Sequence, residues 1–293
     1  MSFTTRRTFI STTGAAAVTA SLVPYHSLAN HHAKRFTIGL SQYSLRAMFK
    51  DGSLDPLDYP AFTADTFGIN AIDLWEGGLP KDKLNDDAYL EKMVAKAAKA
   101  KTEIFLLMTG ALNADPQKSE VSIKQLTPSI GRAKKLGCEY LRIFLRAPGK
   151  DEAAGLAASV EALKPLCDAA GKEGILIAIE PGSSELSQKG AFLAKVYQKV
   201  NHPALTLMPD FGKLRNNVYD GTEAMLPFTK TISCKMHSFD KDGNQPDFDY
   251  PRLMRMITAS KYRGILSIEW EGHELKPVPG VQASKALIER SLA

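Results

Sequence analysis

Short apolar runs alternate with helix-like segments eight times along this chain of 293 residues. The apolar runs have the length and composition of buried strands and lie at 36–43, 69–75, 103–109, 139–146, 174–180, 204–210, 231–237 and 264–270. The helical patterns lie at 56–66, 86–100, 119–136, 152–171, 187–200, 220–229, 249–261 and 281–291. Strict alternation predicts a parallel sheet. Eight repeats, with no sequence left for a second core, favour an α/β fold closed into one single-domain (βα)8 barrel.

The N-terminal segment has the three regions of an export signal. Arg6 and Arg7 come first, an alanine-rich apolar run follows at 14–23, and small residues precede a cleavage point after Ala29. The paired arginines indicate the twin-arginine route and a periplasmic protein. A membrane anchor is the alternative, but the apolar run is short for a stable membrane insertion. The expected division is a signal peptide at 1–29 and a barrel domain at 30–293.

The composition limits the partners of the chain. The formal charge of +5 falls to +3 without Arg6 and Arg7, and no basic block remains, so nucleic acid is not expected as a partner. Cys138 and Cys234 lie in strand patterns and are expected to be buried thiols rather than halves of disulfides. The sequence leaves open whether the chain forms a homo-oligomer.

Four chemically active residues stand at the ends of four successive predicted strands: Glu180, Asp210, His237 and Glu269. Their spacing of roughly 30 residues is that of one strand-helix repeat. In a closed barrel the C-terminal ends of all strands meet at one mouth, where the chemistry of this fold is found. Three carboxylates and one imidazole at that mouth predict a divalent-metal site for Mn, Mg, Co or Zn.

The alternation of side chains along the strands supports this site. Glu180 shares a strand face with Ala178, and Asp210 shares one with Met208, so each candidate lies on the smaller or more polar face of its strand. A glutamate that ends a strand is commonly only the first residue of a loop. Agreement at four strand ends favours a common site over that explanation.

Several other side chains are expected near or inside the barrel mouth. Lys235 shares a face with His237 and would pair with a carboxylate, contact a substrate or form a structural ion pair. Asp73 and Arg142 are expected to point inward and to be paired structurally. The alternation along its strand places Trp270 on the outer face of the barrel, where it is expected to pack in the core between strands and helices. The residues expected to contact substrate are Tyr43, Glu76, Arg146 and Lys235.

The chain resembles the xylose isomerase-like TIM barrel superfamily in its sugar phosphate isomerase/epimerase branch. The resemblance is strongest over 174–272, and its motifs are Ile179-Glu180-Pro181, Met208-Pro209-Asp210-Phe211-Gly212, Ser238 to Asn244 and Tyr262 through Gly272. It implies that Glu180, Asp210, His237 and Glu269 bind the metal. It also implies that Glu180 and Glu269 move protons on opposite faces of a keto-sugar. Pro181 and Gly182 depart from the asparagine or histidine that such epimerases often carry there.

These features together predict a metal-dependent sugar isomerase or epimerase that abstracts a proton next to the carbonyl of a keto-sugar. Export favours a free sugar or an oxidised glycoside over a sugar phosphate. A metal-dependent lyase or hydratase acting on 3-keto-glycosides is the main chemical alternative, since the same proton abstraction can expel a leaving group. A non-catalytic carbohydrate-binding barrel is a further alternative, although a binder has no need of two carboxylates on one metal.

Overall fold

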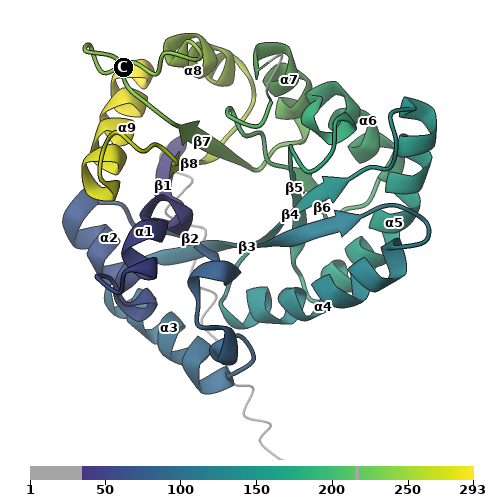
Figure 1. Cartoon of the computed structure of the whole chain (residues 1–293), viewed down its shortest axis with the longest axis horizontal. Helices are drawn as coiled ribbons and strands as arrows, with labels where there is room; N and C mark the ends of the chain where they lie inside the picture. The colour runs from purple at the N-terminus through teal and green to yellow at the C-terminus, as the bar shows by residue number, and fades with distance from the viewer. Residues whose placement is uncertain (1–34, 215–217) are drawn as a thin grey trace, which may run out of the picture.

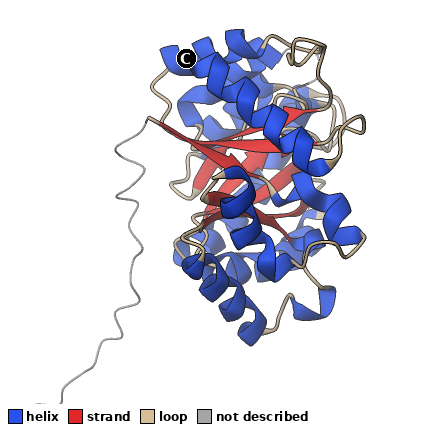
Figure 2. Cartoon of the chain, turned by 90° about the vertical axis from the view of Figure 1, so that its left-hand side faces the viewer, coloured by secondary structure: helices blue, strands red, loops and turns tan. Residues whose placement is uncertain are grey.

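The computed structural model describes residues 35–214 and 218–293. The expected signal peptide and its boundary after Ala29 lie outside these residues. Eight parallel strands form one curled sheet, and a ring of helices surrounds it (Figures 1 and 2). The strands are β1 Phe36–Leu40, β2 Ala71–Trp75, β3 Glu103–Asn113, β4 Tyr140–Arg146, β5 Leu176–Glu180, β6 Leu205–Leu207, β7 Thr231–Met236 and β8 Gly264–Trp270.

The helices that cover the sheet follow the predicted order. They are α1 Arg46–Lys50, α2 Tyr59–Phe67, α3 Asp87–Lys99, α4 Ser119–Lys135, α5 Glu152–Lys172, α6 Gly190–Val200, α7 Val218–Met225, α8 Tyr250–Ala259 and α9 Pro277–Leu292. Short polar side chains cap several of them, as in α5, where Asp151 accepts a hydrogen bond of 2.7 Å from the amide of Ala154. The sequence did not predict α1. The first predicted strand ends early because Gln42–Leu45 form a 3-10 turn.

The two edges of the sheet meet, so the predicted barrel is confirmed. The strand order is β6-β5-β4-β3-β2-β1-β8-β7, and parallel bridges join Leu207 to Thr229 and Asp210 to Ser233. The strand β6 is shorter than predicted because Pro209 has no N–H to continue the ladder. The carbonyl of Pro209 still accepts a hydrogen bond of 2.9 Å from the amide of Ser233.

The apolar side chains form two separate layers, one inside the barrel and one between the strands and the helices. The inner cluster consists of Ala71, Phe105, Leu106, Met108, Tyr140, Ala178, Met208 and Ile265. Trp270 belongs to the outer cluster, as its parity predicted, and stacks on Phe239 with ring centroids 5.4 Å apart. The strand β5 shows the alternation, since Ala178 belongs to the inner layer whereas Ile177 and Ile179 belong to the outer one.

Two further expectations concern thiols and membranes. Cys138 and Cys234 are buried and unpaired, which confirms the prediction of buried thiols. Among the described helices, none combines the length and the apolar character needed to cross a bilayer.

Candidate active site

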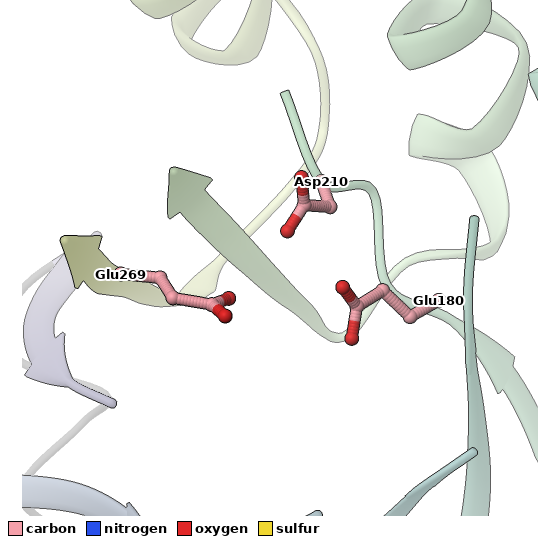
Figure 3. Close-up of side chains that lie close together, drawn as sticks. All are labelled: Glu180, Asp210 and Glu269. Atoms are coloured by element: carbon pink, nitrogen blue, oxygen red, sulfur yellow. The ribbon is translucent and has the colours of Figure 1, made fainter. Parts of the chain in front are cut away.

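Three of the four predicted metal ligands converge at the C-terminal end of the barrel (Figure 3). Glu180 ends β5, Asp210 follows β6, and Glu269 lies near the end of β8. One carboxylate oxygen from each lies within 4.8 Å of the others. The three residues are 1%, 0% and 4% exposed, respectively. A cluster of three buried acids requires compensating cations or a bound metal ion.

His237, the fourth predicted ligand, is not part of this group, which among the described residues consists of Glu180, Asp210 and Glu269. It follows the end of β7 and is half-buried. Its ring packs on Gly212, where an added Cβ would lie 2.8 Å from the ring and 2.7 Å from the stem of Lys235. The register explains the placement, because Lys235 is the β7 residue that pairs with Glu269, and His237 comes two residues later, beyond the strand.

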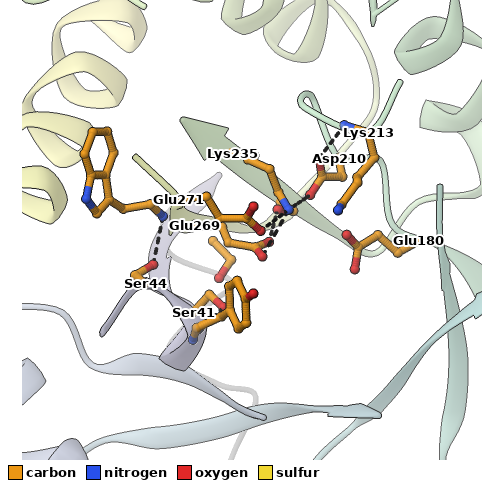
Figure 4. A network of polar contacts seen from close by, with 12 residues as sticks. Ser41, Ser44, Glu180, Asp210, Lys213, Lys235, Glu269 and Glu271 are labelled. Carbon is orange, nitrogen blue, oxygen red and sulfur yellow. Dashed lines mark hydrogen bonds and ion pairs between the residues drawn. The ribbon is translucent and has the colours of Figure 1, made fainter. Parts of the chain in front are cut away.

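Lys235 is the residue of β7 that reaches the carboxylates (Figure 4). Its Nζ lies 3.3 Å from Oδ2 of Asp210, 3.1 Å from Oε1 of Glu269 and 2.7 Å from Oε1 of Glu271. The pairing with carboxylates is one of the interpretations that the sequence left open. It places a buried ammonium group inside the acidic cluster.

Arg142 of β4 is the second cation of the site. Its Nε lies 2.8 Å from Oε2 of Glu180, and its Nη1 donates a hydrogen bond of 2.9 Å to the carbonyl of Thr109. The guanidinium also lies over the ring of Phe144, 4.3 Å from the ring centroid. The sequence predicted inward pairing for Arg142 but did not identify its partner as a predicted catalytic glutamate.

Two neighbouring groups orient the other carboxylates. The hydroxyl of Ser233 donates a hydrogen bond of 2.7 Å to Oε2 of Glu269. The backbone amide of Lys213 donates one of 2.8 Å to Oδ1 of Asp210. Sequence reasoning missed both residues as parts of the site, although the inward parity of Ser233 on β7 was a usable signal.

Burial and pairing drive the pKa values of the two glutamates in opposite directions. Burial raises the pKa of Glu180 well above its usual range, and the charges of Asp210 and Glu269 add to this while Arg142 opposes it. Burial also acts to raise the pKa of Glu269, but the ammonium of Lys235 and the hydroxyl of Ser233 outweigh it and hold that pKa at about 2. Two carboxyl groups with separated pKa values can serve as an acid and a base in one site.

Asp73 is a further buried acid below the cluster. Its Oδ1 accepts a hydrogen bond of 3.0 Å from the amide of Gln42, and its Oδ2 accepts one of 3.3 Å from the hydroxyl of Ser267. Burial, helped by the charge of Glu269, raises the pKa of Asp73 to about 8. The predicted inward direction of Asp73 is therefore correct, and its hydrogen-bond partners are neutral groups.

A cavity of about 470 Å³, within the size range of small-molecule sites, is lined by Glu269, Glu271, Lys235 and Arg142 of this site. Tyr43, Glu76 and Lys235 line it, and these are three of the four residues that the sequence predicts as substrate contacts. Glu76 is also held by Nε of Arg132 at 2.7 Å. Arg146 is exposed and is not among the residues that line this cavity, because it stands beyond the mouth at the end of β4.

Trp75 forms the wall between this cavity and a neighbouring one of about 910 Å³. The ring of Trp75 contacts Tyr43 edge-on, with centroids 4.8 Å apart. His273 lines the neighbouring cavity rather than the one above the carboxylates.

The carboxylate cluster fits a divalent cation by two criteria. Oε2 of Glu180 and Oδ2 of Asp210 are buried and have no hydrogen-bond partner among the described residues, although each lies near a cation. In the described part of the chain, four carboxylates, those of the cluster and Glu271, form ion pairs with two cations, Lys235 and Arg142. A divalent ion would therefore balance the group when all four acids are ionised. Oxygen ligands of this kind suit hard cations such as Mg²⁺ or Mn²⁺.

The fold and the site define a barrel whose polar centre lies at the C-terminal ends of its strands. The chain belongs to the xylose isomerase-like TIM barrel family, whose model matches residues 62–291. The resemblance noted in the sequence is thereby confirmed.

Three known proteins illustrate the range of this similarity. A C-glycoside deglycosidase alpha subunit of Arthrobacter globiformis is 34% identical over 74 residues, covering 23% of this chain and 21% of that protein. A putative hydroxypyruvate isomerase of Danio rerio is 25% identical over 183 residues, covering 55% of this chain and 64% of that protein. The chain thus spans less than two thirds of the length of either relative. A crystal structure of D-psicose 3-epimerase with D-tagatose from Clostridium cellulolyticum H10 matches with a TM-score of 0.68 and 13% identity, covering 88% of this chain and 99% of that one.

Proposed function

We propose that this chain is a sugar isomerase or epimerase that moves a proton next to the carbonyl of a small keto-sugar. The observation that carries the proposal is the convergence of two buried glutamates, Glu180 from β5 and Glu269 from β8, in one carboxylate cluster beside a cavity that Glu269 lines. The hydroxypyruvate isomerase and D-psicose 3-epimerase named above are consistent with this chemistry.

The reaction needs one group to remove a proton and another to return it. The carboxylate of Glu269 would take the proton from the carbon next to the carbonyl, and the bonding electrons would move onto the carbonyl oxygen to form an enediolate. Glu180 would return a proton to the opposite face of the same carbon, which inverts that centre. Return to the neighbouring carbon would instead interconvert a ketose and an aldose.

The surrounding cations would stabilise the charge that develops on the substrate oxygen. Arg142 and Lys235 both line the cavity, and both have N–H groups directed at the carboxylate cluster. Fixed donors in a buried site are effective because they need little reorganisation during the reaction. Tyr43 and Trp75 would form the wall against which the sugar lies.

A divalent metal ion is part of this proposal. Glu180, Asp210 and Glu269 would hold it, with His237 as the fourth ligand implied by the family resemblance. When bound, the ion would supply Lewis-acid polarisation of the substrate carbonyl.

Solvent deuterium exchange tests the proposed chemistry directly. Protein supplied with Mn²⁺ should incorporate deuterium next to the carbonyl of a ketose or a 3-keto-glycoside, and mass spectrometry or NMR would detect it. Absence of exchange with every such sugar would contradict the enolisation and favour a carbohydrate-binding role.

A lyase acting on 3-keto-glycosides is the second candidate. The local similarity to the C-glycoside deglycosidase alpha subunit favours it, because proton abstraction can be followed by loss of the group on the beta carbon. The same exchange experiment separates the two candidates, since only a lyase would release the aglycone together with deuterium uptake.

Export by the twin-arginine route is also proposed, on the basis of the sequence alone. Arg6, Arg7 and the cleavage point after Ala29 support it. Replacing both arginines with lysine should retain the protein in the cytoplasm of the host, as fractionation would measure. Unchanged export of this variant would contradict the route.

A further inference from the structure

Lys235 occupies a central position among the carboxylates. It is 1% exposed, yet its Nζ contacts three different acids, Asp210, Glu269 and Glu271 (Figure 4). Two of these acids belong to the group whose oxygens could hold a metal ion. The ammonium is therefore paired with two of the three carboxylates that a metal ion would need.

The third partner of Lys235 lies outside that group. Oε1 of Glu271 is the nearest of the three oxygens, at 2.7 Å, and the Glu271 side chain is 21% exposed. Lysine has a flexible stem and a compact ammonium without a required geometry, so its head can move while the backbone stays fixed. Glu271 offers a place where the ammonium can remain paired after leaving the other two carboxylates.

We propose that the Lys235 ammonium and a divalent metal ion compete for Asp210 and Glu269, and that Glu271 retains the ammonium when the metal enters. This inference rests on the metal site of the proposed function. In the absence of metal, Lys235 neutralises Asp210 and Glu269, for which no other ion pair is seen among the described residues. Metal binding would then require displacement of an internal cation, and the affinity of the site would depend on both Lys235 and Glu271.

The arrangement of charge supports competition rather than simple coexistence at the present positions. A metal ion held by Asp210 and Glu269 would share these two carboxylates with Nζ of Lys235, and two cations held by the same carboxylates would repel each other. A shift of the ammonium to Glu271 alone removes this repulsion. It also leaves one positive charge in the cavity, next to the place proposed for the substrate oxygen.

Isothermal titration of MnCl₂ into metal-stripped protein tests the inference without any measurement of activity. The variants are Lys235→Met, Glu271→Gln and the double variant, with Lys195→Met as a control that removes an exposed lysine paired with Glu152. Lys235→Met should bind Mn²⁺ about tenfold or more tightly than the wild type, and Glu271→Gln should bind it about tenfold more weakly, the scale of effects from groups beside metal ligands. Lys195→Met should bind Mn²⁺ as the wild type does.

The double variant separates the proposed role of Glu271 from direct metal binding. If Glu271 acts only by retaining Lys235, Glu271→Gln should have no effect on Mn²⁺ affinity in the Lys235→Met background. An equal loss of affinity in both backgrounds would make Glu271 a ligand and overturn its proposed role.

Other outcomes are equally decisive. Equal or weaker Mn²⁺ binding by Lys235→Met would overturn the competition. If no variant binds Mn²⁺, this inference and the metal part of the proposed function both fail, whereas equal binding by all variants removes only this inference. Should Lys235→Met fold only when Mn²⁺ is present, thermal melting with and without the ion would show it, and this dependence would support the exchange of one cation for the other. Glu271→Gln keeps Lys235 and tests the inference independently of that variant.

Discussion

The interior of this barrel has two layers, and the contrast between them separates stability from chemistry. The lower layer is apolar and includes Phe105, Ala178 and Met208. The upper layer, only two residues further along the same strands, contains Glu180 and Asp210 beside buried cations. Close packing of apolar atoms stabilises the first layer. Buried ion pairs contribute less to stability than well-packed apolar groups of similar size, so the upper layer is explained by function rather than by folding.

Truncation in the lower layer should produce the largest effect on folding. Phe105 is 2% exposed, and Phe105→Ala should lower the free energy of unfolding by about 3–5 kcal/mol, because it leaves a cavity in a packed core. Urea titration would measure this loss, with Val121→Ala at a 58% exposed position as the control. Turnover per folded molecule should remain that of the wild type. A large loss of turnover in the folded Phe105→Ala fraction would show that the two layers are not separable.

Substitution in the upper layer should have the opposite pattern. Glu180→Gln and Glu269→Gln each keep an oxygen but remove a group that exchanges protons, so each should lower turnover about 100-fold or more. Deuterium uptake and circular dichroism would be followed on the same samples. Each variant should keep the circular dichroism spectrum of the wild type. Near-normal turnover in either variant would remove that glutamate from the proposed proton transfers.

The acid between the two layers should make stability depend on pH. The pKa of Asp73 is raised from an ordinary value of 3.8 to about 8, by burial first and then by the charge of Glu269. The folded state therefore keeps a proton that the unfolded state has lost, and stability falls as the pH rises from about 4 to about 8.

Asp73→Asn removes this titration and should flatten the pH profile. As the pH rises through this window, the melting temperature of the wild type should fall relative to that of Asp73→Asn. The relative fall should be roughly 4 °C or more, the scale of one to two kcal/mol. Asp58→Asn, at a side chain that is 60% exposed, serves as the control and should follow the wild type. Parallel profiles for Asp73→Asn and the wild type would show that Asp73 is ionised throughout.

The smallest effects should distinguish the wall of the cavity from its rim. Tyr43 contacts Trp75 within the cavity, whereas Arg146 is exposed outside it. Tyr43→Ala should raise the KM for a sugar that supports exchange about three- to tenfold, the value of one aromatic contact. Arg146→Ala should change KM by less than about twofold, as is usual for an exposed charge. A larger effect at Arg146 would restore it as the substrate contact that the sequence predicted.

Much of the fold and part of the site could be predicted because they depend on local patterns. The alternation of strands and helices determines the barrel, and side-chain parity places Glu180, Asp210 and Glu269 on inward faces. The resemblance to the xylose isomerase-like family was also readable from short motifs. None of these features requires knowledge of how one strand is shifted against the next.

The tertiary structure decided which side chains meet. The register between β7 and β8 brings Lys235, rather than His237, to Glu269, and the neighbouring strands β4 and β5 bring Arg142 to Glu180. The carbonyl of Pro209 closes the barrel against Ser233, which in turn donates to Glu269. The sequence specifies on which face of its own strand each side chain lies. Contacts between side chains of different strands depend on the stagger of the closed sheet, and that stagger follows only from the packing of all eight strands.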